Sequence, residues 1–176
     1  MDVFEAIRMK RAVRAFAARP LPDEIVERIL WAGRRAQSSK NTQPWRFIVV
    51  REAATLEALS RLGTYAGHLA GAAMGVVIAM PDPAQRWSIL FDAGQAAAYM
   101  QLAAWELGVG SCLATLYEPD AARSLLAIPA DWHTRVALSF GYPLDESALK
   151  AQPAIGGRRS LGQNVYYERW PDPDAR

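Results

Sequence analysis

Residues 88–107 read SILFDAGQAAAYMQLAAWEL and form the longest helical pattern in the chain. The stretch is rich in alanine and apolar on nearly every side, which predicts a helix buried in the core. Gly108 follows it and is suited to the left-handed cap that ends many helices. Asp92 stands inside this apolar stretch, and we expect it to be a buried, paired structural carboxylate rather than a catalytic base.

The rest of the chain mixes helical and strand patterns without a regular alternation. Helices are expected where apolar residues recur at helical spacing, and strands where β-branched and aromatic residues dominate. The predicted helices are 2–9, 21–36, 54–62 and 118–126, and the predicted strands are 45–51, 75–80 and 134–142, with 110–116 read as a turn and a short strand. Such a mixture favours an α+β fold.

Two of these elements carry a specific expectation about their apolar residues. In the helix at 2–9, Asp2 is suited to the N-cap, and Val3, Phe4 and Ile7 share one side. The strand at 45–51, WRFIVVR, is apolar on both alternations. We therefore expect that strand to be central in its sheet and covered on both faces.

Length and composition favour one domain spanning residues 1–176. The chain has 176 residues, 51% of them hydrophobic, and a formal charge of +2 that does not demand nucleic acid. Its single cysteine, Cys112, excludes an internal disulfide and fits a reducing compartment. The N-terminus does not resemble a signal peptide, and the apolar stretch at 70–80 is too short to span a bilayer. We therefore expect a cytoplasmic protein without a membrane partner.

Two short basic clusters could bind an anion, because arginine offers forked donors that match phosphate. The first, RMKRAVRAF at 8–16, contains Arg8, Lys10, Arg11 and Arg14, and the second is GGRRS at 156–160. By themselves, a solvated stretch after a helix end and a flexible basic loop explain them more simply. The two clusters lie far apart in the sequence without an aromatic platform between them, which disfavours nucleic-acid binding.

A third polar cluster, SSKNTQP at 38–44, lies between a predicted helix and a predicted strand. Its hydroxyl and amide groups can both donate and accept, which suits the edge of a flat heterocycle. The same groups can instead satisfy the backbone of the loop itself. From the loop alone, these two interpretations are evenly matched.

Other kinds of active site find little support in the sequence. His68 and His133 are isolated, and no spacing of Cys, His and Asp predicts a metal site. Cys112 is expected to be a small buried thiol. The chain has no nucleophile elbow, Walker loop or dinucleotide-binding glycine motif. Basic and amide clusters without an acid–base pair are typical of a protein whose cofactor supplies the chemistry.

Five segments, in order along the chain, resemble the FMN-dependent nitroreductase family. They are KRAVRAF at 10–16, RRAQSSKNTQPWRFIVV at 34–50, FDAGQAAAYMQLAAWELGVGSC at 91–112, LSFGYP at 138–143 and RRSLGQNVYYERW at 158–170. Each is modest evidence alone, and five in order are specific. The resemblance implies a nitroreductase-like α+β fold with a central, mainly antiparallel sheet flanked by helices.

The resemblance also implies an intertwined homodimer with two FMN sites at its interface, each built from both chains. C-terminal segments exchange across that interface in the family. The aromatic tail VYYERW at 165–170 has no obvious local partner. It could complete a sheet in its own chain, and the resemblance implies instead that it reaches onto the second subunit.

Carried over position by position, the resemblance implies a set of FMN contacts. In the family an early cation of the first segment serves the phosphate, and Arg14 matches the later one, where a cation stabilises reduced flavin. The polar loop at 38–43 matches the segment that approaches the flavin of the other subunit. The implied cofactor-binding residues are Lys10, Arg11, Ala12, Arg14, Ser38, Ser39, Asn41, Gln43, Ala114, Thr115, Arg158 and Arg159.

The implied substrate walls lie in the region that varies most between subfamilies, and ordinary packing explains each of them as well. They are Tyr65, His68, Trp87 and Phe91. Three departures from the family pattern weaken single contacts with the cofactor. Ala12 stands where Ser is usual, Gln37 stands where Pro is usual, and glycines at 156–157 stand where a cation often precedes the arginines.

The implied activity is hydride transfer from NADH or NADPH, through bound FMN, to a small oxidised acceptor such as a nitroaromatic or a quinone. The mechanism is ping-pong, and no side chain is expected to be catalytic because FMN carries the chemistry. Two alternatives stay open. One is a flavin-binding protein without turnover, such as a redox sensor or cofactor store, and the other is a relative that fragments reduced flavin or removes halide from tyrosines.

Overall fold

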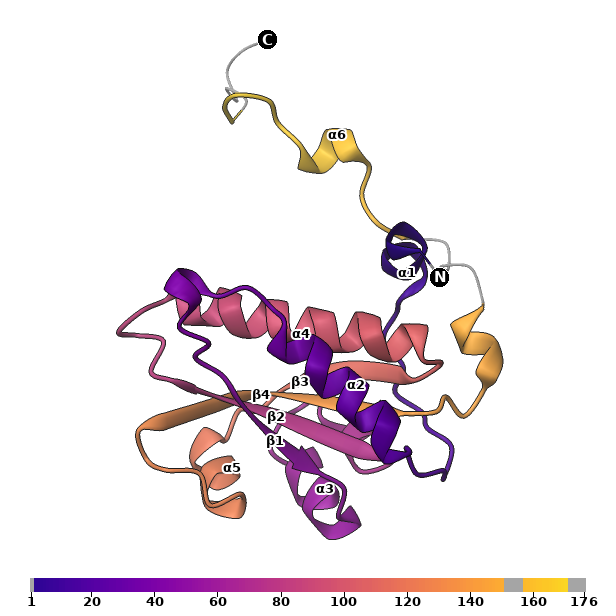
Figure 1. Ribbon diagram of the computed structural model, residues 1–176, viewed down its shortest axis with the longest axis vertical. Helices are drawn as coiled ribbons and strands as arrows, with labels where there is room; N and C mark the ends of the chain where they lie inside the picture. Colours follow the sequence, from indigo (N-terminus) through magenta and orange to yellow (C-terminus); the bar gives the residue numbers. More distant parts are fainter. Residues whose placement is uncertain (1, 151–156, 171–176) are drawn as a thin grey trace.

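The computed structural model describes residues 2–150 and 157–170. In chain order the elements are α1 (Val3–Met9), α2 (Asp23–Arg34), β1 (Arg46–Val50), α3 (Ala53–Ser60), β2 (Met74–Pro81), α4 (Ser88–Glu106), β3 (Gly110–Thr115), α5 (Pro119–Leu125), β4 (Trp132–Gly141) and α6 (Leu161–Asn164). Helices α2 and α4 cover one face of the sheet, and α3 and α5 cover the other (Figure 1). The expected α+β fold is confirmed.

The four described strands form one antiparallel sheet in the order β1-β2-β4-β3. Side chains alternate along central strand β2, so Val76 and Ile78 face α2 and α4 while Val77 faces the layer of α3 and α5. The prediction that strand 45–51 is central is wrong within the described chain, because β1 lies at the edge. An apolar pattern on both alternations reports coverage of the two faces of a sheet, and it says nothing about position along the sheet.

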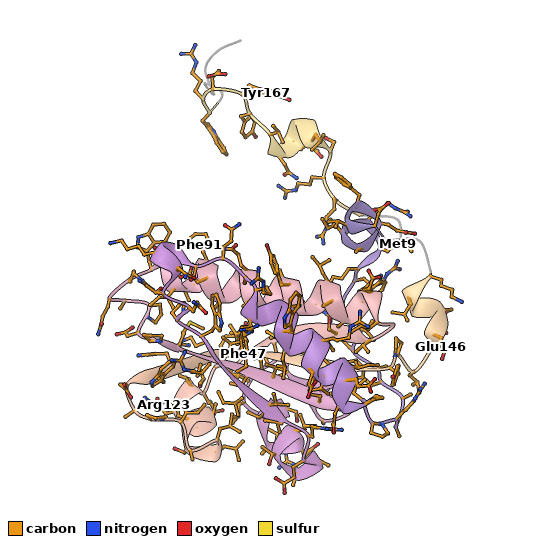
Figure 2. All side chains as sticks on the ribbon, in the orientation of Figure 1. Met9, Phe47, Phe91, Arg123, Glu146 and Tyr167 are labelled. Atoms are coloured by element: carbon orange, nitrogen blue, oxygen red, sulfur yellow. The ribbon has the colours of Figure 1, made fainter. Side chains whose placement is uncertain are left out.

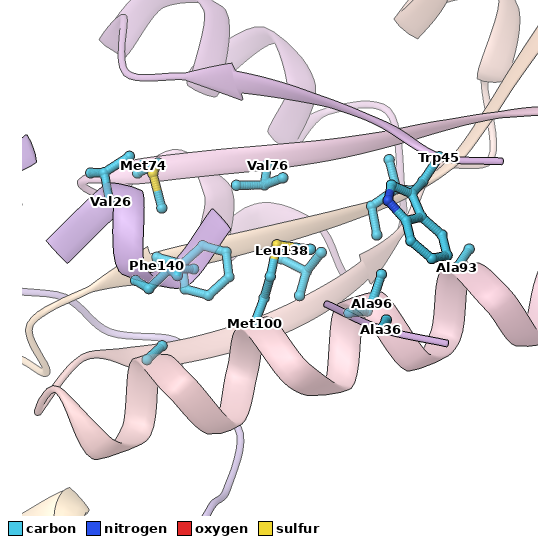
Figure 3. Packing of buried hydrophobic residues seen from close by; sticks show 14 of the residues in the cluster. Val26, Ala36, Trp45, Met74, Val76, Ala93, Ala96, Met100, Leu138 and Phe140 are labelled. Carbon is cyan, nitrogen blue, oxygen red and sulfur yellow. The ribbon is translucent and has the colours of Figure 1, made fainter. Parts of the chain in front are cut away.

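Helix α4 is the centre of the main core. Ala93, Ala96 and Met100 pack against strand residues such as Leu138 and Phe140 (Figure 3). A Cβ added at Gly33 of α2 would lie 2.7 Å from the Met100 side chain, so glycine permits the close crossing of α2 over α4. The opposite side of α4 is more open than its sequence predicts, with these apolar residues exposed: Leu90, Phe91 and Tyr99.

The caps of these helices follow the sequence. Gly108 ends α4 with φ 72°, and the N–H of Val109 donates to the Ala104 carbonyl at 2.8 Å, as expected for a left-handed cap. Asp2 caps α1 by accepting the Glu5 N–H at 2.8 Å. Helix α1 buries Ala6 and Met9, whereas its other apolar side is exposed: Val3, Phe4 and Ile7.

Residues 157–170 form an arm that extends away from the sheet, as the position of Tyr167 shows (Figures 1 and 2). A capping box between Ser160 and Gln163 starts α6. Residues 165–170 belong to no strand, so the described tail does not complete the sheet of its own chain. Its largest apolar side chains are exposed: Leu161, Tyr167 and Trp170. Among the described residues, no helix has the length and apolar character that crossing a bilayer requires.

Candidate functional site

The segment that follows α1 runs along the outer edge of strand β3. Ala12 forms a parallel bridge with Ser111, and the Val13 N–H donates to the Ser111 carbonyl at 3.0 Å. Val13 and Met9 also pack with Trp105 at the end of α4. Backbone pairing and apolar packing therefore attach the segment to β3 and α4. Ala12 takes part through its backbone, and it has no side-chain hydroxyl to offer a ligand.

Two cations from opposite ends of the sequence lie near each other beside this segment. The Lys10 ammonium donates to the Gln101 side chain at 3.0 Å. Burial lowers the pKa of Lys10; Cys112 opposes this shift, and the charge of Arg158 adds to it. Arg11 donates through Nε to the Met9 carbonyl at 3.3 Å. The charge of Arg158, from the second basic cluster, thus acts on Lys10 of the first, and two like charges that act on each other favour an anion as their common partner.

Arg14 is exposed, yet its charge acts on two buried groups below the edge of the sheet. Burial raises the pKa of the Cys112 thiol, and Arg14 and Lys10 oppose that shift. Burial lowers the pKa of His68, and the charge of Arg14 lowers it further. His68 is 7% exposed, and its Nδ1 lies 2.7 Å from the Ser139 hydroxyl oxygen. His68, expected as a substrate wall, is therefore enclosed beside Arg14, and Cys112 is buried as predicted.

The outer edge of β3 pairs with no described strand, and neighbouring segments pack against parts of it, Val13 at Ser111 and Gly63 at Thr115. Ser111 directs its carbonyl outward to Val13. Because the pairing direction alternates along a strand, Leu113 and Thr115 also point their N–H groups outward, whereas Ala114 points toward β4. Of the two β3 residues predicted to contact a cofactor, Thr115 therefore has its N–H at this edge. Leu113 carries no sequence signal by which it could have been selected.

The polar loop at 38–43 lies at the other end of α4. Several of its side chains bond within the loop: Ser38 Oγ accepts the Gln43 N–H at 2.9 Å, the Thr42 hydroxyl donates to the Ser39 carbonyl at 3.0 Å, and the Gln43 amide donates to Asn41 at 3.2 Å. The local interpretation of this loop is therefore realised for these groups. Ligand binding by the loop remains a prediction.

Asp92 in α4 and Arg86, which precedes α4, both form hydrogen bonds to this loop. Asp92 is 3% exposed and accepts the Ser39 N–H at 3.1 Å, so it is a buried, hydrogen-bonded carboxylate as expected. Arg86 donates to the Thr42 hydroxyl at 2.7 Å. Sequence reasoning could not identify these tethers, because their partners lie 53 and 44 residues earlier. Trp87 and Phe91 stand beside them as an exposed edge-to-face pair with ring centroids 5.1 Å apart.

Within one chain, the predicted cofactor contacts at 10–14 and those in the loop at 38–43 lie apart. Lys10 meets α4 at Gln101 and the loop meets it at Asp92. These positions are nine residues apart, which is about 14 Å at 1.5 Å per residue. Figure 2 shows Met9 and Phe91 near opposite ends of α4. Tyr65 and Arg159 are exposed, with Arg159 on the arm.

Buried polar atoms without a partner mark the same two places. Within the described residues they are His68 Nε2 and Ser111 Oγ near Arg14, and Arg86 Nε, Ser88 Oγ and Asp92 Oδ2 near the loop. Unpaired buried groups are uncommon and unfavourable. Cations, outward N–H groups and unsatisfied polar atoms together fit a polar, anionic cofactor such as FMN. No cluster of three metal-ligating side chains occurs among the described residues.

Two grooves beside α2 are lined by neither Lys10, Arg14 nor Arg158. One of about 610 Å³ runs between α1, α2 and α4, with an apolar floor that includes Trp31 and Leu102 and an acidic rim that includes Glu24 and Glu27. A second of about 520 Å³ lies between α2 and edge strand β1 and includes Gln43 of the polar loop. The exposed side of α1 borders the first groove at Val3.

Comparison with known proteins gives consistent matches over most of the chain. The model of the "Nitroreductase family" matches residues 7–63 and 60–142. A candidate NADH dehydrogenase/NAD(P)H nitroreductase of Archaeoglobus fulgidus is 33% identical over 154 residues, covering 82% of this chain and 87% of that protein. An FMN-dependent nitroreductase structure from Clostridium difficile superposes with a TM-score of 0.84 at 26% identity, covering 96% of this chain and 100% of that one.

A more distant structure shares the fold alone. It is the NADPH:FMN oxidoreductase of Vibrio harveyi in complex with NAD+, with a TM-score of 0.84 at 20% identity. The match covers 96% of this chain and 78% of that one.

Proposed function

This chain belongs to the nitroreductase family, and on that premise we propose that it is an FMN-dependent oxidoreductase. Its electron donor is NADH or NADPH, and its acceptor is a small oxidised molecule such as a nitroaromatic or a quinone. When bound, FMN supplies the redox chemistry by taking hydride from the donor and passing it to the acceptor in a ping-pong cycle. The observation that carries the proposal is that the segment bearing Lys10 and Arg14 is bridged to the edge of β3 at Ser111, where the charge of Arg158 also acts on Lys10.

In the proposal, different cationic side chains bind the phosphate and the ring of the cofactor. Lys10 and Arg158 hold the phosphate end, with Arg11 and Arg159 as neighbouring cations, because charge-assisted bonds to phosphate are the strongest that these side chains offer. Arg14 lies against the β3 edge, where its charge stabilises a negative ring. The outward N–H groups of Leu113 and Thr115 would be available to donate to the ring edge. These are binding and electrostatic roles, and none of these residues transfers a proton in the proposal.

A second copy of the chain completes the site. The polar loop is about 14 Å along α4 from the Lys10 contact, and the family resemblance supports assigning its Ser38, Ser39, Asn41 and Gln43 to the FMN of the partner. The exposed aromatic arm, the unpaired edge of β1 and the apolar groove beside α1 support a homodimer in which the arm crosses to the other subunit. Exposed apolar side chains that gather on one surface often mark an interface.

The exposed aromatic residues Trp87 and Phe91 support a proposed acceptor site. Trp87 and Phe91 stand beside the loop, so in a dimer they face the ring that the loop serves. A flat acceptor would stack on such an aromatic pair. Tyr65 is exposed and can contribute to this site, whereas His68 is buried and is not proposed to contact the acceptor.

The test uses the purified protein and its colour. It should be yellow and release FMN on denaturation, and anaerobic NADH or NADPH should bleach the flavin absorbance rapidly. A colourless protein that cannot be loaded with FMN would overturn the proposal. A yellow protein that neither donor bleaches would favour the non-catalytic alternative, a flavin store or sensor.

A further inference from the structure

The loop at 38–43 is positioned by a carboxylate that belongs to a different element. Asp92 Oδ1 accepts the Ser39 backbone N–H at 3.1 Å, across 53 residues of sequence. This bond therefore fixes where the loop stands relative to α4, whereas the bonds inside the loop fix only its local shape. The Arg86 bond to the Thr42 hydroxyl, 2.7 Å long, is a second tether at the same end of α4.

The loop has reason to need tethers, because its backbone conformation is unfavourable. Lys40, Asn41 and Gln43 have φ values of 52°, 54° and 46°, and none of them is glycine. Left-handed backbone is disfavoured for residues with a Cβ, and such conformations persist where the surroundings impose them. Without an external acceptor for the Ser39 N–H, we expect the loop to sample other shapes.

The environment of Asp92 indicates that this residue positions the 38–43 loop rather than stabilises the fold. The carboxylate is 3% exposed, and its second oxygen, Oδ2, has no hydrogen-bond partner among the described residues. A buried carboxylate with one unsatisfied oxygen is a poor stabilising group. Its clear structural effect is on Ser39, one of the loop residues implied to meet FMN.

We propose that Asp92 is a positioning residue, which holds the 38–43 loop in the shape that meets FMN. The inference rests on the proposed function, because it takes FMN as the ligand of the loop. Asp92 itself does not touch the cofactor, and it acts through the Ser39 amide.

The test compares four variants of the full chain, one of which, Arg86→Ala, removes the second tether. Asp92→Ala removes the acceptor of the Ser39 N–H, Asp92→Asn keeps an acceptor oxygen while removing the charge, and Leu59→Ala is the control. Leu59 is fully buried in the layer below the sheet, away from the loop. Each protein is examined for FMN affinity by quenching of flavin fluorescence, for the visible spectrum of bound flavin, and, without flavin, for melting temperature and hydrogen exchange of the loop.

Asp92→Ala should weaken FMN binding by roughly 10-fold or more, since an unmet backbone donor is left in the loop. Exchange of the loop amides should accelerate in the flavin-free protein, and the spectrum of bound flavin should shift. Asp92→Asn should restore affinity to within about threefold of wild type. Leu59→Ala should lower the melting temperature with FMN affinity unchanged. Arg86→Ala, which cuts the second tether, should weaken FMN binding in the same direction and provides the comparison if Asp92→Ala does not fold.

Two results would overturn the inference while leaving the proposed function intact. One is wild-type FMN affinity in both Asp92→Ala and Arg86→Ala, and the other is an affinity loss in Leu59→Ala as large as in Asp92→Ala at equal melting temperature. Failure of the wild-type protein to bind FMN at all would overturn the proposed function and this inference together.

Discussion

His68 Nδ1 lies 2.7 Å from the Ser139 hydroxyl oxygen, and both residues are buried below the edge of the sheet that carries Arg14. Burial and the Arg14 charge both favour the neutral imidazole, so the pKa of His68 is lower in the folded protein than its ordinary value. This pair therefore makes the stability of the fold sensitive to acid.

Acid should destabilise the fold through His68. Below pH 6.5 the unfolded chain binds a proton at this residue while the folded chain does not, so the free energy of unfolding falls as the pH is lowered through that window. The slope is up to about 1.4 kcal/mol per pH unit for one proton. Chemical denaturation between pH 5 and pH 7 should show a smaller slope in His68→Gln. Ser139→Ala should be less stable at every pH yet keep the slope, since burial of the ring remains.

The arginines of the arm should serve the cofactor phosphate. Arg158→Ala combined with Arg159→Ala is expected to weaken FMN affinity by roughly 10- to 100-fold, because charge-assisted bonds to phosphate are lost. The melting temperature of the flavin-free protein should change little, because both side chains are exposed. Riboflavin, which lacks the phosphate, is the matched ligand, and the double variant should bind it as wild type does. Equal losses of affinity and flavin-free stability would show that the arginines are structural.

Two helix ends provide a reciprocal test of backbone strain. Ala127 follows α5 with φ 51°, and the N–H of Ile128 donates to the Arg123 carbonyl at 2.9 Å, the same type of cap that Gly108 makes for α4. Ala127→Gly should stabilise the protein by about 0.5–1 kcal/mol and Gly108→Ala should destabilise it by about 1 kcal/mol. Thermal melting would show shifts of roughly 2–4 °C per kcal/mol in opposite directions. A lower melting temperature in Ala127→Gly would contradict this explanation.

Cys112 should react slowly with thiol reagents in the folded state. It is 3% exposed, and burial raises its pKa more than Arg14 and Lys10 lower it, so little thiolate is available near neutral pH. A chromogenic disulfide reagent should titrate one thiol per chain rapidly in denaturant and only slowly without it. Rapid labelling of the native protein at pH 7 would contradict the burial of the Cys112 side chain in β3.

The arm should be required for assembly. A chain that ends at residue 156 loses the exposed aromatic side chains of the arm together with Arg158 and Arg159. Light scattering should find a dimer for the full chain and mainly monomer for the shortened one, which should also retain no FMN. Tyr167→Asp with Trp170→Asp tests the aromatic contribution while keeping the arginines, and it should weaken the dimer more than Arg158→Ala with Arg159→Ala. A shortened chain that remains a stable dimer would show that the arm is not the main contact.

Local sequence patterns were sufficient to predict the helices and strands and much of the core. The length of α4 follows from its alanine-rich run, its end from Gly108, and the start of α1 from Asp2. These features depend on neighbours within a few residues, so they can be read directly from the sequence. The edge position of β1 could not, because strand order depends on pairings between segments far apart in the chain.

The sequence by itself determined which residue types are available for a site: cations at 10–14 and 158–159, and a polar loop at 38–43. The tertiary structure decided how they are grouped. The charge of Arg158 acts on Lys10, and His68 is buried within reach of the Arg14 charge. The loop is hydrogen-bonded to Asp92, about 14 Å along α4 from the Lys10 contact. The physical reason is that charge repulsion, burial and a hydrogen bond across 53 residues act through space, whereas a sequence pattern records only spacing along the chain.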